Sequence, residues 1–409
     1  MVLTNTRTAR ITFVHTSSIF NMRGSEQWLM AVAGLLASKN VRVKILNFDY
    51  DRRFVTARLN ANLERISLNE KPSHMEIRFL RGFRLRFPYR FAKTRGFLSQ
   101  CYEASRFFPL SRTFFRSIKD SDLVYFVQCQ RHAKHLLPVL FVAALAGRKN
   151  VLVGIHVKVK PTTLDSFFLR LFSRIGILKG AHVLSRDITG YISRNYGCRA
   201  YYIPNAIDPK EFYQATEKDD SEFRILYVGA LTDVKGANLL PSIYLKLKSL
   251  SIPFKLYVCT QGGPLMRELY YFASVHRDDF ILVGFVDHIK LAYYYNRSHV
   301  VIVPSRREQF PLVPLEAQAC GTPVVGFDIP GLRQCVLPSE TGFLAKKGDV
   351  DDLVERITYL YNLVRYDRGR YEKITMAATR FVYSNFSWGV VLRLIIRLFN
   401  STIDKKAQL

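Results

Sequence analysis

The chain has 409 residues, 48% of them hydrophobic, which excludes a disordered polypeptide and suits two packed domains of about 200 residues each. The formal net charge is +27, and it is unevenly distributed. Residues 1–206 hold 34 Lys and Arg against 11 Asp and Glu, whereas the remainder holds 26 against 22. We therefore expect only the first domain to meet a polyanion or an anionic surface.

The six cysteines are scattered and form no CxxC pair, which argues against a metal knuckle or a disulfide framework. A reducing cytoplasm fits best. Thr6–Arg10 leads directly into a strand pattern, so no signal peptide is expected. The longest apolar run, 136–147, is about half of the roughly 20 residues that a membrane span requires. The sequence predicts a cytoplasmic protein, peripheral at the inner face of the cell membrane.

The chain begins with a strand, loop, helix, strand pattern. Residues 11–15 form a buried strand pattern, 17–25 a loop, 26–38 an amphipathic helix and 41–46 a second strand. This order places Gly24 at the helix entrance, where backbone NH groups and the helix dipole favour an anion. The alternative is a glycine that serves only its turn.

A basic and aromatic segment extends from Arg78 to Arg95 with the sequence RFLRGFRLRFPYRFAKTR, which contains no acidic residue. Cations beside aromatic rings suit an anionic lipid surface, where each cation contributes about 1 kcal/mol. The segment therefore predicts contact with an anionic membrane surface. A solvated strand and loop with core-facing aromatics is the alternative, and a nucleic-acid partner is disfavoured.

The first half continues with strands at 123–127 and 151–156, separated by a helix around 136–146. His156 ends the second of these strands, where a ligand-facing side chain would lie, although a lone histidine is more often structural. Short strands at 183–185 and 200–203 precede a turn at 204–208. We place the boundary of the first domain, residues 1–206, in this turn.

The second half repeats the alternation of strands and helices. Strands are expected at 224–228, 254–259 and 280–283, and helices at 238–250, 289–296 and 349–363. Two successive arrays of this kind imply two Rossmann-like α/β domains, the second over 207–385. Residues 386–409 predict an amphipathic tail helix that packs back on the first domain.

The most informative stretch is Val300–Phe327. A strand ends at Pro304-Ser305, a loop carries Glu308, a short helix carries Glu316, and another strand follows. In a parallel sheet this loop lies at the carboxyl edge, where ligands bind. Carboxylates accept hydrogen bonds from paired hydroxyls, and the free NH groups at the helix start, near Leu312, suit a phosphate. The combination indicates a sugar nucleotide.

The segment PSRREQFPLVPLEAQACGTPVVGFDIPG resembles the Glu-x7-Glu signature of the retaining GT-B glycosyltransferases of family 4, among the group 1 glycosyltransferases. The resemblance extends along nearly the whole chain through RGSEQWLMAVAGLLASKNVRV, YYIPNAIDPKEF, ILYVGALTDVKG, FILVGFVDHIKLAYYYNRSHVVIVPS, SETGFLAKKGDVDDLVERI and FSW, in family order. It implies an α/β GT-B fold, in which the parallel sheets of two Rossmann-like domains face each other across a cleft.

The resemblance also implies roles for individual residues. Glu308 would hold the donor sugar hydroxyls, Glu316 the nucleotide ribose, and Lys235 the diphosphate leaving group. His156 matches the strand-end histidine near the transferred sugar and is the third expected catalytic residue. The remaining donor-binding positions are Gly24, Gly229 and the segment Phe310, Pro311, Leu312 and Val313.

Two positions depart from the family pattern. Ala230 stands where the family often has an arginine, so Lys235 carries more of the diphosphate contact or Arg306 and Arg307 contribute. Pro311 stands where the family has a glycine, and it has no NH to donate to the sugar. Donor preference could differ as a result.

The implied activity is retaining, metal-independent hexosyl transfer from a UDP- or GDP-linked sugar to a lipid-linked or otherwise anionic glycan acceptor, which the first domain holds in this family. Fixed cations stabilise the departing diphosphate without a metal. We therefore expect no metal and no cofactor. The alternatives are a catalytically silent GT-B subunit that binds a polyanion, and a sugar-nucleotide epimerase or phosphorylase on the same fold.

Overall fold

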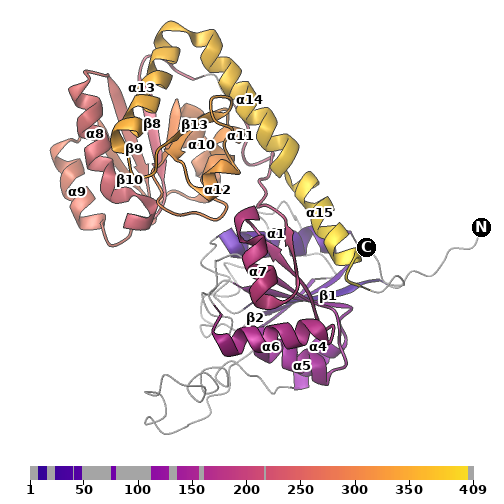
Figure 1. Cartoon of the computed structure of the whole chain (residues 1–409). Helices are drawn as coiled ribbons and strands as arrows, with labels where there is room; N and C mark the ends of the chain where they lie inside the picture. Colours follow the sequence, from indigo (N-terminus) through magenta and orange to yellow (C-terminus); the bar gives the residue numbers. More distant parts are fainter. Residues whose placement is uncertain are drawn as a thin grey trace, which may run out of the picture. The chain divides into compact units, whose positions relative to one another are not determined.

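The computed structural model describes residues 8–15, 24–39, 41–47, 75–79, 112–128, 136–155, 161–215 and 218–403. Contacts divide the chain into two units, one formed by Met1–Ile203 with Leu392–Leu409 and the other by Pro204–Val391 (Figure 1). The domain boundaries predicted from the sequence lie after residues 206 and 385. Each unit is an α/β structure with its own parallel sheet.

The first unit contains a seven-stranded sheet in the order β3-β2-β1-β4-β5-β6-β7. Its strands, all parallel, are β1 (Arg10–His15), β2 (Arg42–Asn47), β3 (Met75–Phe79), β4 (Leu123–Gln128), β5 (Val151–Ile155), β6 (Leu178–Val183) and β7 (Arg199–Tyr202). The strand order reverses between β1 and β4, which is the topological switch point of an open α/β sheet.

The helices of the first unit follow the strands in sequence. They are α1 (Gly24–Ala37), α4 (Arg112–Lys119), α5 (Leu136–Leu145), α6 (Thr163–Arg174), α7 (Thr189–Tyr196) and the end of α15 (Trp388–Asn400). Helix α6 begins with a capping box, in which Thr162 and Asp165 exchange side chain to backbone hydrogen bonds. In α15, the ring of Phe399 packs against Phe13 and Tyr125, with centroids 6.4 and 5.6 Å apart.

The core of the first unit encloses a neutral histidine. The Nδ1 atom of His182 lies 2.6 Å from the Tyr125 hydroxyl, and its Nε2 lies 2.8 Å from the Ile203 carbonyl oxygen. A carbonyl can only accept, so Nε2 carries the proton and the neutral ring satisfies both contacts. Burial lowers the pKa of His182 to about 4.

The second unit contains a six-stranded parallel sheet in the order β10-β9-β8-β11-β12-β13. The strands are β8 (Phe223–Val228), β9 (Phe254–Cys259), β10 (Phe280–Gly284), β11 (Val300–Val303), β12 (Val324–Phe327) and β13 (Gly342–Ala345). The helices are α8 (Leu240–Ser249), α9 (Met266–Val275), α10 (His288–Arg297), α11 (Val313–Ala319), α12 (Pro330–Arg333), α13 (Val350–Tyr366) and α14 (Arg368–Phe386). Helix α11 contacts both α10 and α14.

A glycine brings the loops after β8 and β11 into direct contact. Gly236 follows a short 3-10 helix, Asp233–Lys235, and has φ +72°, in the left-handed region that favours glycine. A Cβ atom at this position would lie 2.0 Å from the Pro304 carbonyl oxygen. Beside it, the Arg306 NH donates to the Val234 carbonyl at 2.9 Å. The turn that carries Lys235 therefore packs on the end of β11.

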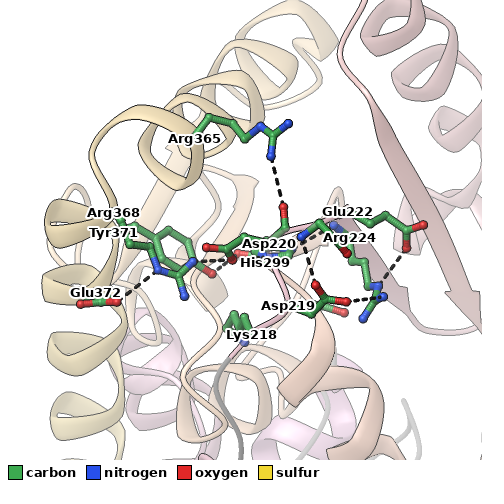
Figure 2. A network of polar contacts seen from close by, with 12 residues as sticks. Lys218, Asp219, Asp220, Glu222, Arg224, His299, Arg365, Arg368, Tyr371 and Glu372 are labelled. Carbon is green, nitrogen blue, oxygen red and sulfur yellow. Dashed lines mark hydrogen bonds and ion pairs between the residues drawn. The ribbon is translucent and has the colours of Figure 1, made fainter.

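A polar network surrounds His299 at the opposite end of β11 (Figure 2). The imidazole is fully buried; its Nδ1 accepts from the Arg224 backbone NH at 3.0 Å, and its Nε2 lies 3.1 Å from Asp220 Oδ1. Arg368 on α14 donates to the same carboxylate oxygen at 2.6 Å, and the Tyr371 hydroxyl donates to the His299 carbonyl. The network ties the chain before β8 to β11 and α14.

Lys218 anchors the preceding residues of the same segment. Its ammonium is buried and donates to Thr322 Oγ1 at 2.8 Å and to the Asn296 carbonyl at 3.1 Å, near the end of α10. Cations are favourable at helix C-termini because they pair with the last carbonyls. Burial opposes the charge and lowers the pKa of Lys218 to about 7.

The Gly236 contact predicts a large stability cost for a single methyl group. Gly236→Ala should lower the free energy of unfolding by about 2 kcal/mol or more, since it adds both a strained φ and a clash with Pro304. Urea unfolding of the purified protein measures the loss.

Variants of two other glycines allow the cost of the strained φ and the cost of the clash to be measured separately. Gly348 has φ +81° and Gly369 has no strained φ, and a methyl group added at either position would meet only open space. Gly348→Ala should cost only the strain, and Gly369→Ala, in α14, should be neutral or stabilising by roughly 0.5–1 kcal/mol. Equal losses in Gly236→Ala and Gly348→Ala would contradict the clash.

The His299 network predicts acid sensitivity of the fold. Burial lowers the pKa of His299 to about 4, below the usual value of about 6.5, so the unfolded chain binds the proton more readily. The stabilising contribution is complete above about pH 6.5 and is lost as the pH falls toward 4, by up to roughly 3 kcal/mol. Urea midpoints measured at pH 7 and pH 5 follow this loss.

Because carboxylates also contribute to acid unfolding, the informative quantity is the difference between variants. His299→Gln should be less stable than the wild type at pH 7 but should lose less stability between pH 7 and pH 5. His182 remains in both proteins and accounts for part of the common slope. Identical pH dependence in the two proteins would refute the assignment to His299.

Candidate functional site

Two predicted site residues meet at the carboxyl ends of neighbouring strands. Lys235 follows β8, Glu308 follows β11, and these strands pair in parallel. The Lys235 Nζ lies 2.6 Å from Glu308 Oε1, and the Ser305 hydroxyl donates to the same oxygen at 2.9 Å. The structure therefore brings together Lys235 and Glu308, and it adds Ser305, which the sequence reasoning missed.

The exposure of this pair suits ligand binding. The Glu308 side chain is 13% exposed and the Lys235 side chain 39% exposed, so the ammonium reaches the surface while the carboxylate is largely enclosed. Both protein contacts go to Oε1, and a carboxylate offers about four lone-pair positions. Glu308 can therefore accept further hydrogen bonds from hydroxyls while Lys235 contacts an anion beside it.

Glu316 is held by the neighbouring helix. It lies on α11 with its side chain 5% exposed; Oε1 is 3.0 Å from His288 Nε2, and Oε2 accepts from the Tyr295 hydroxyl at 2.8 Å. Burial and the Glu316 charge raise the pKa of Tyr295 well above its usual value. The two donors are seven residues apart on α10, which is the spacing of one helical face.

His288 lies between two carboxylates. Its Nδ1 is 3.8 Å from Glu211 Oε2, opposite the contact with Glu316, and its ring meets Phe212 edge to face at 5.0 Å. The His288 side chain is 26% exposed, far more than that of Glu316. A hydroxyl group that approaches Glu316 therefore meets His288 at the surface of the same site.

The predicted donor-binding segment Phe310–Val313 lies at the start of α11. Phe310 is buried, its carbonyl accepts from Asn205 Nδ2 at 2.9 Å, and its ring packs against Phe386. Leu312 is the N-cap residue and supplies no side-chain cap, and α11 begins at Val313. Anion binding by the main-chain NH groups at this helix start stays a prediction, and Pro311 has no NH to contribute.

The other predicted positions have varied outcomes. Gly229 follows β8 directly, and its NH donates to the Cys259 carbonyl at 3.1 Å, so the amide is already used within the sheet. Gly24 is the first residue of α1, and the loop before it lies outside the described residues. His156, directly after β5, also lies outside them. Arg306 and Arg307 are exposed beside Glu308.

A cavity of about 710 Å³ lies beside the start of α10. It is lined by Val283, Phe285, Val286, Asp287, Lys290, Tyr293 and Tyr294, which come from the end of β10 and from α10. The sequence reasoning did not identify it, because its walls come from a strand end and a helix face that only the fold combines. Its lining residue Asp287 directly precedes His288 in the chain.

The described residues contain neither a metal cluster nor a membrane span. No three His, Cys, Asp or Glu side chains within the described ranges form a group that could hold a metal ion. Among the helices in the described part of the chain, none is both long and apolar enough to cross a membrane.

Comparison with known proteins identifies a family match in the second unit and relatives of about half of the chain. Residues 208–379 match the family model of the glycosyl transferases group 1. The chain is 29% identical over 180 residues to an uncharacterized glycosyltransferase of Methanocaldococcus jannaschii, a match that covers 44% of this chain and 48% of the relative. It is 28% identical over 194 residues to a D-inositol 3-phosphate glycosyltransferase of Pseudarthrobacter chlorophenolicus, covering 46% and 44%. The chain thus spans about half the length of the curated relatives that it matches.

Solved structures resemble the chain over nearly its whole length. A glycosyltransferase from Rickettsia africae has a TM-score of 0.73 at 16% identity and covers 97% of this chain and 98% of its own. Sucrose-phosphate synthase from Thermosynechococcus elongatus has a TM-score of 0.70 at 19% identity, covering 96% and 98%. Anabaena HepE, solved in complex with UDP and glucose, has a TM-score of 0.68 at 17% identity, covering 96% and 100%. These likenesses confirm the predicted GT-B fold.

The family match includes Lys235, Glu308 and Glu316, the three residues around which the site is built. Residues 208–379 are therefore similar to the group 1 glycosyl transferases.

Proposed function

We propose that this protein is a retaining glycosyltransferase that moves a hexose from a nucleotide diphosphate to a lipid-linked or membrane-proximal glycan. The observation that carries the proposal is the contact between Lys235 and Glu308 at the carboxyl ends of β8 and β11. A cation and a hydroxyl acceptor 2.6 Å apart match the junction between a diphosphate and a sugar. Relatives named as glycosyltransferases support the same reaction class.

The donor sugar and its diphosphate would bind on opposite sides of this contact. Glu308 accepts hydrogen bonds from sugar hydroxyls, and the Lys235 ammonium faces the diphosphate. The NH groups at the start of α11 and the exposed Arg306 and Arg307 supply further positive potential nearby. These fixed groups would stabilise the departing diphosphate, so the proposed reaction requires no metal.

The nucleoside would extend from the diphosphate toward α10. Glu316 and His288 would receive the ribose hydroxyls, with the imidazole and the carboxylate offering adjacent polar atoms. The base would enter the cavity of about 710 Å³ beside Asp287, where aromatic and apolar side chains provide a stacking surface. UDP and GDP are the proposed carriers, and UDP is bound by the similarly folded HepE.

In the proposed reaction, the bond between the anomeric carbon and the diphosphate oxygen breaks as positive charge develops on the sugar. Lys235 stabilises the negative charge on the leaving diphosphate, and Glu308 keeps the sugar oriented. The acceptor hydroxyl attacks from the face that the leaving group vacates and gives its proton to the departing phosphate. Anomeric configuration is thereby retained without a covalent enzyme intermediate. His156 is the proposed contact of the first unit near the transferred sugar.

The acceptor is proposed to be anionic or membrane-linked because the first 206 residues carry most of the positive charge. We propose that the protein works in the cytoplasm, peripheral at the inner face of the cell membrane. The Arg78–Arg95 segment, proposed as a lipid contact, lies outside the described residues except for its first two, which end β3.

Replacing the Lys235 ammonium tests the catalytic proposal. Lys235→Ala should reduce sugar transfer by about 10²–10³-fold, the usual effect of removing one group that stabilises a leaving-group charge. The donor is first identified by thermal shift with UDP-, GDP- and ADP-sugars, since a ligand of the folded state raises the melting temperature. Transfer is then measured with the radiolabelled donor and membrane extract, with analysis of the products.

A second lysine in the same unit is a matched control. Lys246, on α8, forms an exposed ion pair with Asp351, and Lys246→Ala should leave transfer unchanged. Full activity of Lys235→Ala would contradict the proposed role of Lys235 in stabilising the leaving group. Products that carry an isomerised sugar nucleotide or a sugar phosphate, rather than a glycosylated acceptor, would indicate an epimerase or a phosphorylase.

Substitution of His288 tests the proposed ribose site. His288→Ala removes the donor to Glu316 Oε1 and should weaken nucleotide binding about tenfold or more, because hydrogen bonds to charged groups are among the stronger ones. The effect should appear in KM for the donor and in the Kd of the free nucleotide, with a smaller change in kcat.

His288→Gln is the corresponding conservative variant, since its amide can still donate to Glu316. It should recover part of the nucleotide affinity lost in His288→Ala. If both variants bind the nucleotide as the wild type does, His288 has no part in donor recognition.

A further inference from the structure

Neighbouring helices of the first unit expose large apolar side chains. Helix α5 contacts both α4 and α6, and these helices lie together in Figure 1. We define the α5–α6 face by six exposed residues: Phe141 (43% exposed), Leu145 (78%), Leu164 (38%), Phe167 (61%), Leu171 (40%) and Ile175 (50%). Exposed apolar groups that gather in this way mark an interaction surface more often than scattered ones do.

Helix α6 carries an apolar surface that is wider than the part it buries. Leu169 and Phe172 are buried against the rest of the unit. Leu164, Phe167 and Leu171 recur at intervals of three and four residues, which places them on one side of the helix, and they remain exposed. A surface helix usually buries its apolar side, so the exposed part of this surface calls for a partner outside this unit.

Ring contacts join α5 and α6 into one continuous surface. Phe141 on α5 packs edge to face against Phe172 on α6 at 4.9 Å and against Phe168 at 5.8 Å. Phe168 in turn meets Phe167 at 5.5 Å. The exposed rings of Phe141 and Phe167 are therefore linked through a shared cluster, and the apolar surface of α5 continues onto α6.

The charge around the α5–α6 face is positive. Exposed or half-buried cations surround it: Arg112, Arg116 and Lys119 on α4, Arg148 and Lys149 after α5, and Arg170 and Arg174 on α6. The acids in the described part of this region, residues 112–128, 136–155 and 161–179, are few. Asp165 is buried in the capping box, Asp122 pairs with Arg10, and Asp120 is exposed after α4.

We infer that the α5–α6 face is a docking surface for an anionic lipid bilayer. Phe167, Leu171 and Leu145 would enter the boundary between headgroups and acyl chains, while the surrounding Arg and Lys side chains would contact lipid phosphates. This inference rests on the proposed function in one respect, because it names the surface by which a membrane-proximal transferase would reach its acceptor.

Charge complementarity favours lipid over the other occupants of such a face. A second copy of the chain would place the same basic rim against itself, and like charges brought together are repulsive. The Arg78–Arg95 segment of the same chain is also basic and has no acid to pair with the rim. An anionic bilayer offers an apolar phase to the exposed apolar side chains and negative charge to the basic rim.

Vesicle flotation tests the inference. The full chain should float with vesicles of phosphatidylcholine and phosphatidylglycerol at low salt, and it should float poorly with phosphatidylcholine alone or at high salt. Phe167→Ser with Leu171→Ser should weaken binding at least tenfold, and Arg174→Gln should weaken it about fivefold. Melting temperature confirms that each variant is folded.

Exposed apolar residues of the second unit provide the matched control. Tyr271→Ser with Met376→Ser removes two side chains that are 73% and 61% exposed on α9 and α14, and flotation should not change. Wild-type binding by the Phe167→Ser, Leu171→Ser variant would overturn the inference, as would failure of the wild-type chain to float. Dimerisation of the wild type that the same variant abolishes, without vesicle binding, would assign the face to a second copy instead.

Donor binding distinguishes failure of this inference from failure of the proposed function. The Phe167→Ser, Leu171→Ser variant should keep the thermal shift with the sugar nucleotide that the wild type shows, while losing flotation. Lys235→Ala should show the reverse, with flotation kept and the nucleotide response reduced. A chain that floats normally but responds to no sugar nucleotide would leave the docking surface standing and remove the proposed function.

Discussion

The candidate site depends on the close approach of Gly236 to the end of β11. Strands β8 and β11 are neighbours, but their following loops could diverge. The left-handed conformation at Gly236, with no Cβ to meet the Pro304 carbonyl, lets the turn of Lys235 lie directly on the chain that leads to Glu308. Two charges that are far apart in sequence thereby come within 2.6 Å. The proposed joint recognition of a diphosphate and a sugar depends on this contact between the loops.

Much of the fold could be predicted from the sequence because the strands of a parallel sheet are buried on both faces. The apolar runs of β11 and β12 are therefore continuous, and the helix expected at 349–363 is present as α13, with Asp349 as its N-cap. Strands β3 and β13 were missed, since Met75–Phe79 alternates with charged residues and Gly342–Ala345 is short and begins with glycine. Helix α14 was missed because its apolar residues are spread among basic and polar ones, and contacts with α11 define its buried side.

The positions of the candidate site residues could be predicted where they depend on local structure, but not where they depend on tertiary contacts. The order of strand, loop and helix was sufficient to place Glu308 at the sheet edge. The partners of Glu316 were not accessible in this way, since His288 and Tyr295 come from a different helix. One signal was present: Glu316 lies in a helix whose other residues from Pro314 to Ala319 are all buried, and a buried carboxylate requires donors. Helix α10, with polar groups seven residues apart, was the element able to supply them.

The exposure of side chains in the first unit indicates where its positive charge borders an apolar surface. From the sequence, basic and aromatic residues were most concentrated at Arg78–Arg95, and no helix was expected at the position of α6. The structure shows that α6 buries Leu169 and Phe172 and leaves part of its apolar surface, including Phe167, in solvent. Hydrophobic periodicity cannot separate a core stripe from an exposed one, because both follow the same helical repeat. Burial against the first sheet makes the distinction, and it leaves an apolar face with a basic rim that an anionic bilayer would complement.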